Sequence, residues 1–174
     1  MNIKSTRLIV LELLNKMDQG AFSNLALDSM LNGTDFSERD KAFISRLFYG
    51  ILERKITLEY IISVYSSKPL SKLDQIIVNV LEIGLYQIMY MDSVPDNAAV
   101  NETVNLTKQV KKASAAGFVN ALLRNFIRDG KIIKYPENKI QRLSVEYSCN
   151  IQLVDKLCLY YSYDCIKNFL KSSL

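Results

Sequence analysis

Apolar residues recur every three or four positions along most of the 174-residue chain, and no stretch sustains the strict alternation typical of a strand. This spacing predicts amphipathic helices joined by short polar connections. The helices expected from it span about residues 6–17, 23–32, 37–52, 58–65, 72–91, 98–111, 117–129, 137–147, 152–160 and 164–171. The pattern therefore indicates an all-α fold.

Capping residues mark several of the expected helix ends. The sequences SERD at 37–40 and SKLD at 71–74 each place a serine three residues before an aspartate, a spacing typical of a helix N-terminus. Further along, Asp96 or Asn97 is expected to cap the next helix. Gly130 is expected to end the last long helix.

The helix expected over residues 72–91 differs from the others because apolar residues occur on all of its sides. A helix with this pattern is typically the buried centre of a bundle. Gly84 lies within it, where glycine costs about 1 kcal/mol relative to alanine. We therefore expect Gly84 to permit the close approach of a neighbouring helix rather than to break this one.

The end of the chain differs from the part before it, because Tyr135-Pro136 is followed only by short helical segments. We expect two parts, a helical domain over residues 1–130 and a helical linker segment over residues 131–174. No internal repeat indicates a solenoid.

Composition excludes several classes of protein. Hydrophobic residues make up 49% of the chain and charged residues 23%, as in an ordinary globular protein. No apolar run approaches the ~20 residues needed to span a bilayer, so no membrane contact is expected. The N-terminus lacks the features of a signal peptide, and a cytoplasmic location is therefore expected.

The residue types that form metal sites and nucleophilic sites are scarce. Histidine is absent, and Cys149, Cys158 and Cys165 lack the spacing of a zinc site or of a Cys-x-x-Cys motif. We expect these cysteines to be buried structural thiols, and we expect no metal site. The chain also contains no phosphate-binding loop, dinucleotide fingerprint or nucleophile elbow.

Positive charge is concentrated in one region of the chain. Residues 108–134 contain seven cations and one acid, Asp129, whereas the net charge of the whole chain is only +4. The cations are Lys108, Lys111, Lys112, Arg124, Arg128, Lys131 and Lys134. A local basic surface of this kind favours a polyanionic partner.

The helix expected over residues 117–129 places two of these cations on one face. Asn120, Arg124 and Arg128 follow each other at a spacing of four residues, opposite the apolar residues. Guanidinium groups bind phosphate through paired hydrogen bonds, and the helix start beside Ser114 offers backbone N–H groups. The pattern therefore predicts a face along which RNA or DNA can bind.

The same pattern also has a purely structural interpretation. An exposed arginine is often only solvated, and Arg124 could instead pair with an acid such as Glu102. Phe118 could pack in the core rather than stack on a base. Spacing and charge do not decide between this interpretation and nucleic-acid binding.

Several stretches of the chain resemble a known family. They read RDKAFISRLFYGILER (39–54), LEIGLYQIMYMDSVPDNAAVNE (81–102), GFVNALLRN (117–125) and RLSVEYSCNIQLVDKL (142–157). Together they resemble the NusB-like RNA-binding domain, most closely the form at the N-terminus of the Sun/Fmu (RsmB-type) ribosomal RNA cytosine-C5 methyltransferases. The resemblance covers essentially the whole chain and implies a NusB-like helical bundle followed by a helical linker.

Two features separate this chain from the free-standing antitermination factors of the same family. Those factors typically end soon after their Phe-Val-Asn helix and have an aspartate where this chain has Arg124. This chain instead continues through residues 131–174. The family usually has a histidine where this chain has Asn97, a residue that can still cap a helix.

The resemblance also implies where RNA would bind. NusB-type domains contact RNA at the start of the first helix and around the loop before Phe-Val-Asn. In this chain those places hold Arg7, Lys111, Lys112, Ser114 and Phe118. The helical face adds Arg124 and Arg128, and Lys108 is a further candidate.

The function implied by the resemblance is that of an RNA-binding accessory domain. It would position small-subunit ribosomal RNA for cytosine-C5 methylation by a C-terminal domain outside this sequence, which would use S-adenosylmethionine and two catalytic cysteines. We therefore expect no catalytic and no cofactor-binding residue in this chain. The expected partners are ribosomal RNA and the chain's own methyltransferase domain.

Three alternatives stay open. The chain could be a transcription antitermination factor that binds boxA RNA together with ribosomal protein S10. It could also be a helical protein-interaction domain with little RNA contact. Finally, the basic face could bind RNA without reading its sequence, since phosphate contacts carry no sequence information.

Overall fold

The computed structural model describes residues 5–32 and 36–173, and every regular element in these two stretches is helical. The α-helices are α1 (Thr6–Asp18), α2 (Ser23–Asn32), α3 (Glu38–Tyr65), α4 (Gln75–Tyr90), α5 (Asp96–Gln109), α6 (Ala116–Arg128), α7 (Lys139–Glu146), α8 (Ile151–Cys158) and α9 (Tyr163–Ser172). Two short 3-10 helices, η1 (Leu70–Lys72) and η2 (Ala113–Ala115), precede α4 and α6. The expected all-α fold is confirmed.

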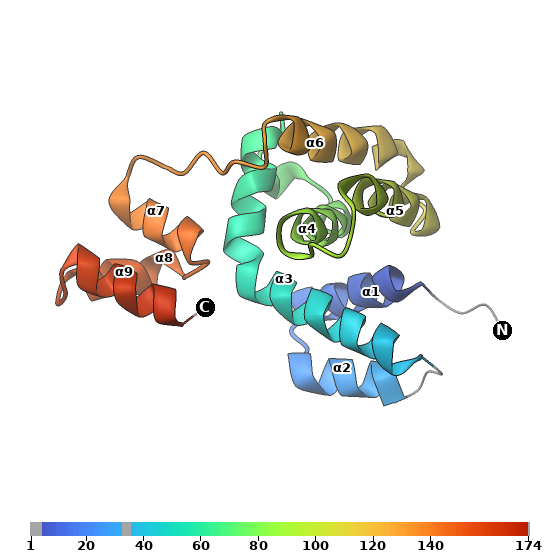
Figure 1. The fold of residues 1–174 in the computed structure, drawn as a ribbon, viewed down its shortest axis with the longest axis horizontal. Helices are drawn as coiled ribbons and strands as arrows, with labels where there is room; N and C mark the ends of the chain where they lie inside the picture. Colours follow the sequence, from blue (N-terminus) through green and yellow to red (C-terminus); the bar gives the residue numbers. More distant parts are fainter. Residues whose placement is uncertain (1–4, 33–35, 174) are drawn as a thin grey trace.

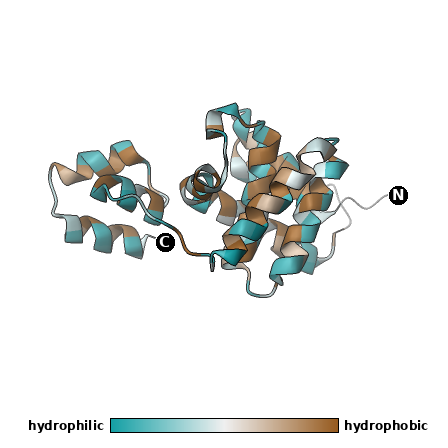
Figure 2. Cartoon of the chain, turned by 90° about the horizontal axis from the view of Figure 1, so that it is seen from above, coloured by the Kyte–Doolittle hydropathy of each residue, from teal (hydrophilic) through white to brown (hydrophobic). Residues whose placement is uncertain are grey.

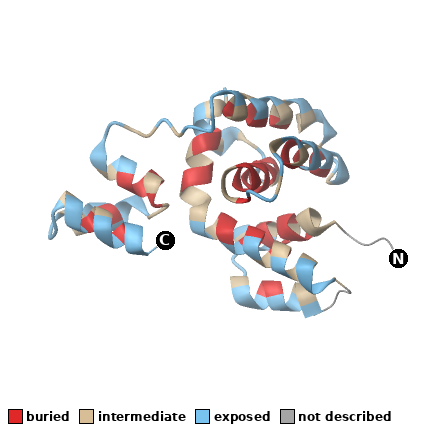
Figure 3. Cartoon of the chain, viewed as in Figure 1, coloured by how far each residue is buried: buried red, intermediate tan, exposed pale blue. Residues whose placement is uncertain are grey.

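Helix α4 is the centre of the main bundle (Figure 1). Every residue from Ile77 to Ile88 is buried. Helices α1, α3, α5 and α6 pack around it, and they leave their outer sides exposed, as Figure 3 shows. The expectation of a buried central helix is therefore confirmed, although the helix begins at Gln75 rather than near residue 72.

The two predicted capping sequences start their helices in different ways. Ser37 caps α3, because its Oγ accepts a hydrogen bond from the N–H of Asp40 at 3.2 Å. In the second sequence the cap is Asp74 and not Ser71, since residues 70–72 form η1. The Oδ1 atom of Asp74 accepts a hydrogen bond from the N–H of Ile76 at 3.0 Å.

The start of α5 differs from the expectation. The helix begins at Asp96 itself, with Pro95 at the N-cap position and no capping side chain. Proline suits a helix start, because its φ is already helical and it has no N–H group to satisfy. The predicted caps, Asp96 and Asn97, are therefore wrong, and Asp96 instead pairs with Lys131.

The expected break after residue 52 does not exist, and α3 runs without interruption from Glu38 to Tyr65. The charged run at residues 53–55 resembles a solvated connection, but it contains neither the glycine nor the proline that would end a helix. Its lysine is used inside the fold, because Lys55 Nζ lies 3.2 Å from Asp18 Oδ1 of α1. The long helix α3 therefore spans the whole height of the bundle.

Two glycines let neighbouring side chains approach the helix backbone closely. A Cβ atom at Gly84 would lie 2.9 Å from both Leu123 Cδ1 and Thr103 Oγ1, so the predicted close packing at this residue is confirmed. A Cβ atom at Gly50 of α3 would lie only 2.0 Å from the hydroxyl oxygen of Tyr86. The ring of Tyr86 therefore lies across α3 where only glycine leaves room.

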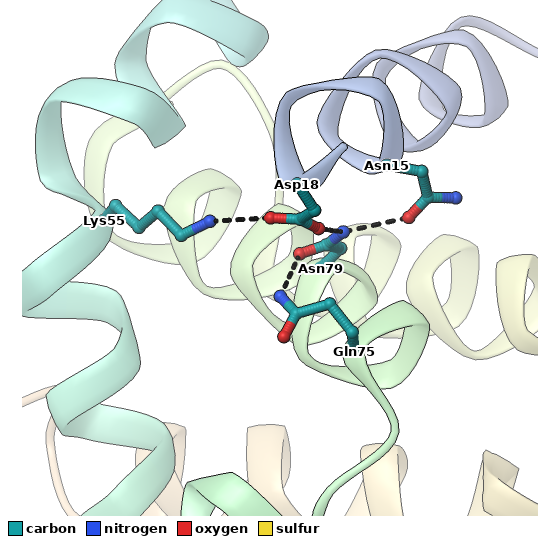
Figure 4. A network of polar contacts seen from close by, with 5 residues as sticks. All are labelled: Asn15, Asp18, Lys55, Gln75 and Asn79. Carbon is teal, nitrogen blue, oxygen red and sulfur yellow. Dashed lines mark hydrogen bonds and ion pairs between the residues drawn. The ribbon is translucent and has the colours of Figure 1, made fainter. Parts of the chain in front are cut away.

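A polar cluster joins α1, α3 and α4 (Figure 4). The Nδ2 atom of Asn79 donates hydrogen bonds to Asn15 Oδ1 at 2.9 Å and to Asp18 Oδ2 at 2.7 Å. Gln75 Nε2 donates to Asn79 Oδ1 at 3.1 Å, and Lys55 pairs with the other oxygen of Asp18. Because its polar groups satisfy one another, the cluster fixes the end of α1 against α4.

Glu82 lies one turn beyond Asn79 on α4 and has a different environment. Both of its carboxylate oxygens are buried without a hydrogen-bond partner among the described residues. Burial raises the pKa of Glu82 to about 8, Lys55 opposes this shift, and the carboxylates of Glu59 and Asp18 add to it. The folded protein therefore keeps Glu82 largely protonated at neutral pH.

Helices α7, α8 and α9 form a smaller group beside the main bundle, as the two views in Figures 1 and 2 show. The hydrophobic side chains buried in this group are Leu143, Tyr147, Val154, Ile166 and Leu170. The division of the chain into domains at residues 1–130 and 131–174 stays a prediction.

The group of α7 to α9 is attached to the bundle through α3. Thr57 Oγ1 donates a hydrogen bond to the carbonyl oxygen of Val145 at 2.6 Å, and both groups are buried. Tyr60 donates from its hydroxyl group to the carbonyl oxygen of Lys134 at 2.7 Å. These bonds hold the connecting segment and the end of α7 along one side of α3.

Replacing Gly50 with alanine tests the close approach of Tyr86. We expect Gly50→Ala to lower the free energy of unfolding by about 2 kcal/mol, because the buried tyrosine ring must move away from the new methyl group. The matched control is Gly117→Ala, where a Cβ atom meets nothing within 4 Å. This control should raise the free energy of unfolding by up to about 1 kcal/mol through helix propensity. Urea titrations followed by circular dichroism measure both, and equal effects would contradict the prediction.

Glu82 is expected to make stability depend on pH. The unfolded chain releases this proton near the ordinary pKa of 4.5, whereas the folded protein keeps it to about pH 8. The resulting stabilisation is complete below pH 4.5 and is lost as pH rises through about 8. Glu82→Gln cannot ionise, so its free energy of unfolding should increasingly exceed that of the wild type as pH rises through this window.

The measurement for Glu82→Gln is a series of urea midpoints between about pH 5 and about pH 9. Glu137→Gln is the control, because Glu137 is exposed and forms no ion pair with any described residue. Parallel pH profiles of the wild type and Glu82→Gln would show that the buried carboxyl group is not the cause.

Candidate nucleic-acid interface

Helix α6 buries its apolar side against the bundle and leaves the predicted polar face open. Arg124 and Arg128 are exposed, whereas the apolar residues of the opposite side, Val119, Leu122, Leu123 and Phe126, are buried. Arg124 Nε donates a hydrogen bond to Asn120 Oδ1 at 2.9 Å, and it does not pair with Glu102. Neither arginine forms an ion pair with a described residue, so both can offer guanidinium N–H groups to a ligand.

The turn between α5 and α6 carries most of the other predicted residues. Lys108 lies in the last turn of α5, and Lys111 follows that helix; both are exposed and have no ion pair within the described stretches. Ser114 is exposed in η2. Phe118, in the first turn of α6, is half-buried and packs against the bundle core. The structure thus places these cations just before the N-terminal end of α6, the helix that carries Arg124.

The backbone of Lys111 adopts a conformation that favours glycine. Its φ is +59°, in the left-handed region, which costs a residue with a Cβ atom roughly 1–2 kcal/mol. The N–H of Lys112 reaches back to the carbonyl oxygen of Thr107 at 2.8 Å, a bond typical of a Schellman helix end. A lysine therefore occupies a position where glycine would suit the fold better.

Carboxylates from other parts of the chain neutralise some of the predicted basic region. Lys112 pairs with Asp74, and this contact holds the pKa of Asp74 below its usual value. Lys131 lies 2.8 Å from Asp96. These two acids precede the basic region in the sequence, so the positive charge counted between residues 108 and 134 overstates that of the folded surface.

The cations of this region that have no carboxylate partner among the described residues are Lys108, Lys111, Arg124 and Arg128. We call these four residues the α6 basic face. Lys112 and Ser114 border it, and Lys134 lies 3.8 Å from Asp129 at the far end of α6. The arrangement offers separate positive charges in the last turn of α5, in the turn that follows it and along α6, which suits a series of phosphates better than a single anion.

Arg7 occupies a different place. It is half-buried near the start of α1, where its Nε donates a hydrogen bond to Gln87 Oε1 at 2.8 Å. Its guanidinium carbon lies 5.2 Å from the ring centre of Phe43. Burial lowers the pKa of Arg7, and the carboxylate of Glu102 partly opposes this shift. No hydrogen bond or ion pair joins Arg7 to the other predicted RNA-binding residues in the described part of the chain.

Sequence reasoning missed a second group of arginines, at the joint between the bundle and α7. Arg54 lies 5.3 Å from the ring centre of Tyr90, and Arg142 lies 5.5 Å from that of Tyr135. Arg46 Nη2 donates to the carbonyl oxygen of Tyr90 at 3.0 Å. In the sequence, the only indication of this group was that Arg46 and Arg54 lie four residues before and four residues after Gly50. Because these groups already hold helices together, they are not assigned to the α6 basic face.

The described residues provide neither a metal site nor a membrane span. No three histidine, cysteine, aspartate or glutamate side chains within residues 5–32 and 36–173 are grouped so as to hold a metal ion. No helix in these stretches combines the length and apolar character required to cross a bilayer. The three cysteines are free; Cys165 is exposed, and Cys149 and Cys158 are only half-buried. The prediction of buried thiols is therefore wrong for Cys165 and only partly met by the other two.

The sequence of the bundle matches a known family. Residues 4–128 match the model of the NusB family. The chain belongs to the NusB family. The match covers α1 to α6 and therefore confirms the predicted NusB-like helical bundle, whereas α7, α8 and α9 of this NusB-family chain lie beyond it.

Its relatives fall into two groups. A probable ribosomal RNA small subunit methyltransferase B of Bacillus subtilis is 32% identical over 172 residues, which are 98% of this chain and 38% of that protein. The ribosomal RNA small subunit methyltransferase B of Proteus mirabilis is 35% identical over 119 residues, 67% of this chain and 27% of that protein. The transcription antitermination protein NusB of Ruminiclostridium cellulolyticum is 32% identical over 111 residues, 63% of this chain and 74% of that protein.

The two groups differ in length relative to this chain. The NusB-family chain spans less than two fifths of the Bacillus subtilis methyltransferase and about a quarter of the Proteus mirabilis one. The match to the Bacillus subtilis protein is long enough to include nearly all of α7 to α9.

Lys111→Gly tests whether the lysine at the end of α5 costs stability. We expect the free energy of unfolding to rise by roughly 0.5–1 kcal/mol, because relief of the left-handed strain exceeds the added entropy of the unfolded chain. Chemical denaturation measures this. Lys108→Gly is the control, since Lys108 is in helix α5, where glycine should destabilise by about 1 kcal/mol. A destabilised Lys111→Gly would show that this side chain makes contacts that stabilise the fold.

Proposed function

We propose that this NusB-family chain is the RNA-binding accessory domain of a ribosomal RNA small subunit methyltransferase. In this proposal, the α6 basic face holds small-subunit ribosomal RNA by its phosphates, while a methyltransferase domain outside this sequence modifies a cytosine. The single observation that carries the proposal is the match to the Bacillus subtilis methyltransferase, which extends over 98% of the chain and so past the NusB-family bundle.

The chemistry of the α6 basic face supports phosphate binding. Arg124 and Arg128 lie one helical turn apart and can each bind a phosphate through two N–H groups. Lys108 and Lys111 add point charges in the last turn of α5 and in the turn that leads to α6. The half-buried ring of Phe118, in the first turn of α6, leaves part of an aromatic side chain open to solvent. RNA backbone contacts of this kind supply affinity and orientation rather than sequence selection.

Arg7 belongs to the proposal in a narrower sense. Its hydrogen bond to Gln87 and its position over Phe43 give it a structural role at the start of α1. Arg7 stays a predicted RNA contact, but only through the part of its guanidinium group that Gln87 and Phe43 do not cover. We therefore place the main contact on the α6 basic face.

S-adenosylmethionine would supply the methyl group in the methyltransferase domain. The cavity between α8 and α9 does not fit this cofactor, because Leu157, Ile166 and Phe169 line it together with only two residues that carry polar side-chain atoms, Tyr161 and Cys165. No charged side chain is present there to hold the amino acid part of the cofactor. We assign no cofactor-binding or catalytic residue to this chain.

A transcription antitermination factor is the second candidate. The observation that favours it is the match to the Ruminiclostridium cellulolyticum antitermination protein, which covers 74% of that relative. Such a factor would use the same α6 basic face on boxA RNA, with ribosomal protein S10 as partner. Sequencing the reading frame beyond Leu174 separates the two candidates, because only the first requires a methyltransferase domain there.

Replacing Arg124 and Arg128 by alanine tests the proposed RNA contact. If the four cations of the α6 basic face each neutralise about one phosphate, log K should fall against log salt with a slope of roughly −2.8 on single strands. The double variant removes two contacts, so the slope should become shallower by about 1.4, and binding should weaken by roughly tenfold. Fluorescence anisotropy with labelled small-subunit ribosomal RNA segments at several salt concentrations measures both quantities.

The matched control is Lys156→Ala/Lys171→Ala, which removes the same charge from exposed positions on α8 and α9. Lys111→Gly adds a second test, because it should bind RNA more weakly although its fold is more stable. A flat salt response of the wild type, or equal affinities of the wild type and the Arg124/Arg128 variant, would reject RNA binding at this face. That result would favour a protein-interaction domain with little RNA contact.

A further inference from the structure

Helices α8 and α9 and the turn between them expose an unusual amount of apolar surface. Leu159 is 75% exposed, Tyr160 80% and Phe169 58%. Ile151, Leu153 and Tyr161 are exposed as well. Single exposed apolar residues are common on protein surfaces, but several within two short helices indicate a surface that binds something.

Two of these apolar residues, Tyr161 and Phe169, border a hollow rather than a flat surface. A cavity of about 320 Å³ lies between α8 and α9, lined by Leu157, Tyr161, Cys165, Ile166 and Phe169. Charged residues lie outside this lining, among them Asp155 and Lys156 on α8 and Lys167 and Lys171 on α9. An apolar centre with a polar rim is the usual composition of a protein–protein interface.

The small core of this part of the chain also indicates a missing neighbour. Helices α7 to α9 bury only five hydrophobic side chains among themselves. Burial of each of these side chains contributes about 1.5–3 kcal/mol to the free energy of folding. This contribution is modest compared with the entropic cost of ordering three helices and their connections. Among these three helices, only α7 packs extensively against the bundle, where it contacts α3. Contacts with the bundle therefore contribute little to the stability of α8 and α9.

We propose that this surface, the cavity between α8 and α9 with Tyr161 and Phe169 at its edges, is the docking site of the methyltransferase domain of the same polypeptide. The inference rests on the proposed function. It is supported by the Bacillus subtilis relative, which matches 98% of this chain but is covered only to 38% of its own length. That relative contains the counterpart of α8 and α9 together with a much larger remainder that can cover them.

Docking at this surface would have a consequence for the α6 basic face. The end of α7 is fixed to α3 by the buried bond from Thr57 to Val145, and α3 in turn packs against α6. A domain seated on α8 and α9 is then held at a set position relative to Arg124 and Arg128. The RNA would be presented to the methyltransferase domain from a defined direction rather than by a loose tether.

Cys165 provides a natural probe, since it is exposed and lines the cavity. The experiment compares the 174-residue chain with the full-length protein during brief labelling by N-ethylmaleimide, with mass spectrometry to read each cysteine separately. Labelling of Cys165 should be slower by about tenfold or more in the full-length protein, because a covered thiol is inaccessible to the reagent. Phe169→Asp in the full-length protein should restore fast labelling.

The matched control is Phe22→Asp, which places the same charge on an equally apolar residue that is 77% exposed near the start of α2. It should leave Cys165 protected. Because Phe22 and Phe169 are both exposed, neither substitution is expected to unfold the protein, and thermal unfolding checks this.

Four results would overturn the inference. Cys165 could react equally fast in both proteins. Its protection in the 174-residue chain could grow with protein concentration, which would mean that a second copy covers the surface. Protection could require added RNA, which would make the aromatic residues an RNA contact. Protection could also persist in Phe169→Asp.

The failure of this inference can be told apart from that of the proposed function. If the full-length protein methylates ribosomal RNA while any of these results is obtained, only the docking inference fails. If the reading frame encodes no methyltransferase domain, the proposed function fails.

Discussion

Removal of α4 from water on all of its sides is the constraint on which the bundle depends. A helix whose residues from Ile77 to Ile88 are all buried needs neighbours in every direction, and α1, α3, α5 and α6 provide them. Each buried side chain of the size of leucine or isoleucine contributes about 1.5–3 kcal/mol, so exposing even one side of α4 would remove much of the net stability of a domain. Each covering helix can bury only one side in this way. The outer sides of these helices, including the α6 basic face, are therefore available for other purposes.

The few polar residues of α4 determine how α1 lies against it. Asn79 binds Asn15 and Asp18 at the end of α1, and Gln87 accepts a hydrogen bond from Arg7 at its start. Gln87 in turn donates to the carbonyl oxygen of Ile83 at 2.8 Å, so its amide group is satisfied on both sides. Apolar contacts alone permit sliding by a turn with little loss, whereas a slip here would leave buried amides without partners. Glu82, whose carboxylate oxygens have no partner in the described part of the chain, is the exception within this helix.

Two surfaces with different chemistry lie on this NusB-family chain. The α6 basic face consists of two arginines on α6, a helix anchored in the main core, and two lysines at the end of α5 and in the turn that follows it. The surface of α8 and α9 is apolar and belongs to helices with a small core of their own. A helix face that binds phosphates must stay solvated and charged until the ligand arrives. Covering an apolar hollow with another protein surface instead lowers the free energy by removing apolar area from water. The two surfaces are therefore suited to different kinds of partner.

Much of the fold could be predicted from the sequence by itself. The period of its apolar residues indicated an all-α bundle, the apolar run after residue 72 indicated the central helix, and the spacing of Asn120, Arg124 and Arg128 indicated an open polar face on α6. These features are encoded locally, because helical periodicity relates residues only three or four positions apart. Tertiary structure alone decided which charges remain without partners: Asp74 and Asp96 reach Lys112 and Lys131 from other parts of the chain, and Gln87 and Phe43 engage Arg7. It also exposed Cys165, because long-range packing, and not local spacing, determines which side chains another part of the chain covers.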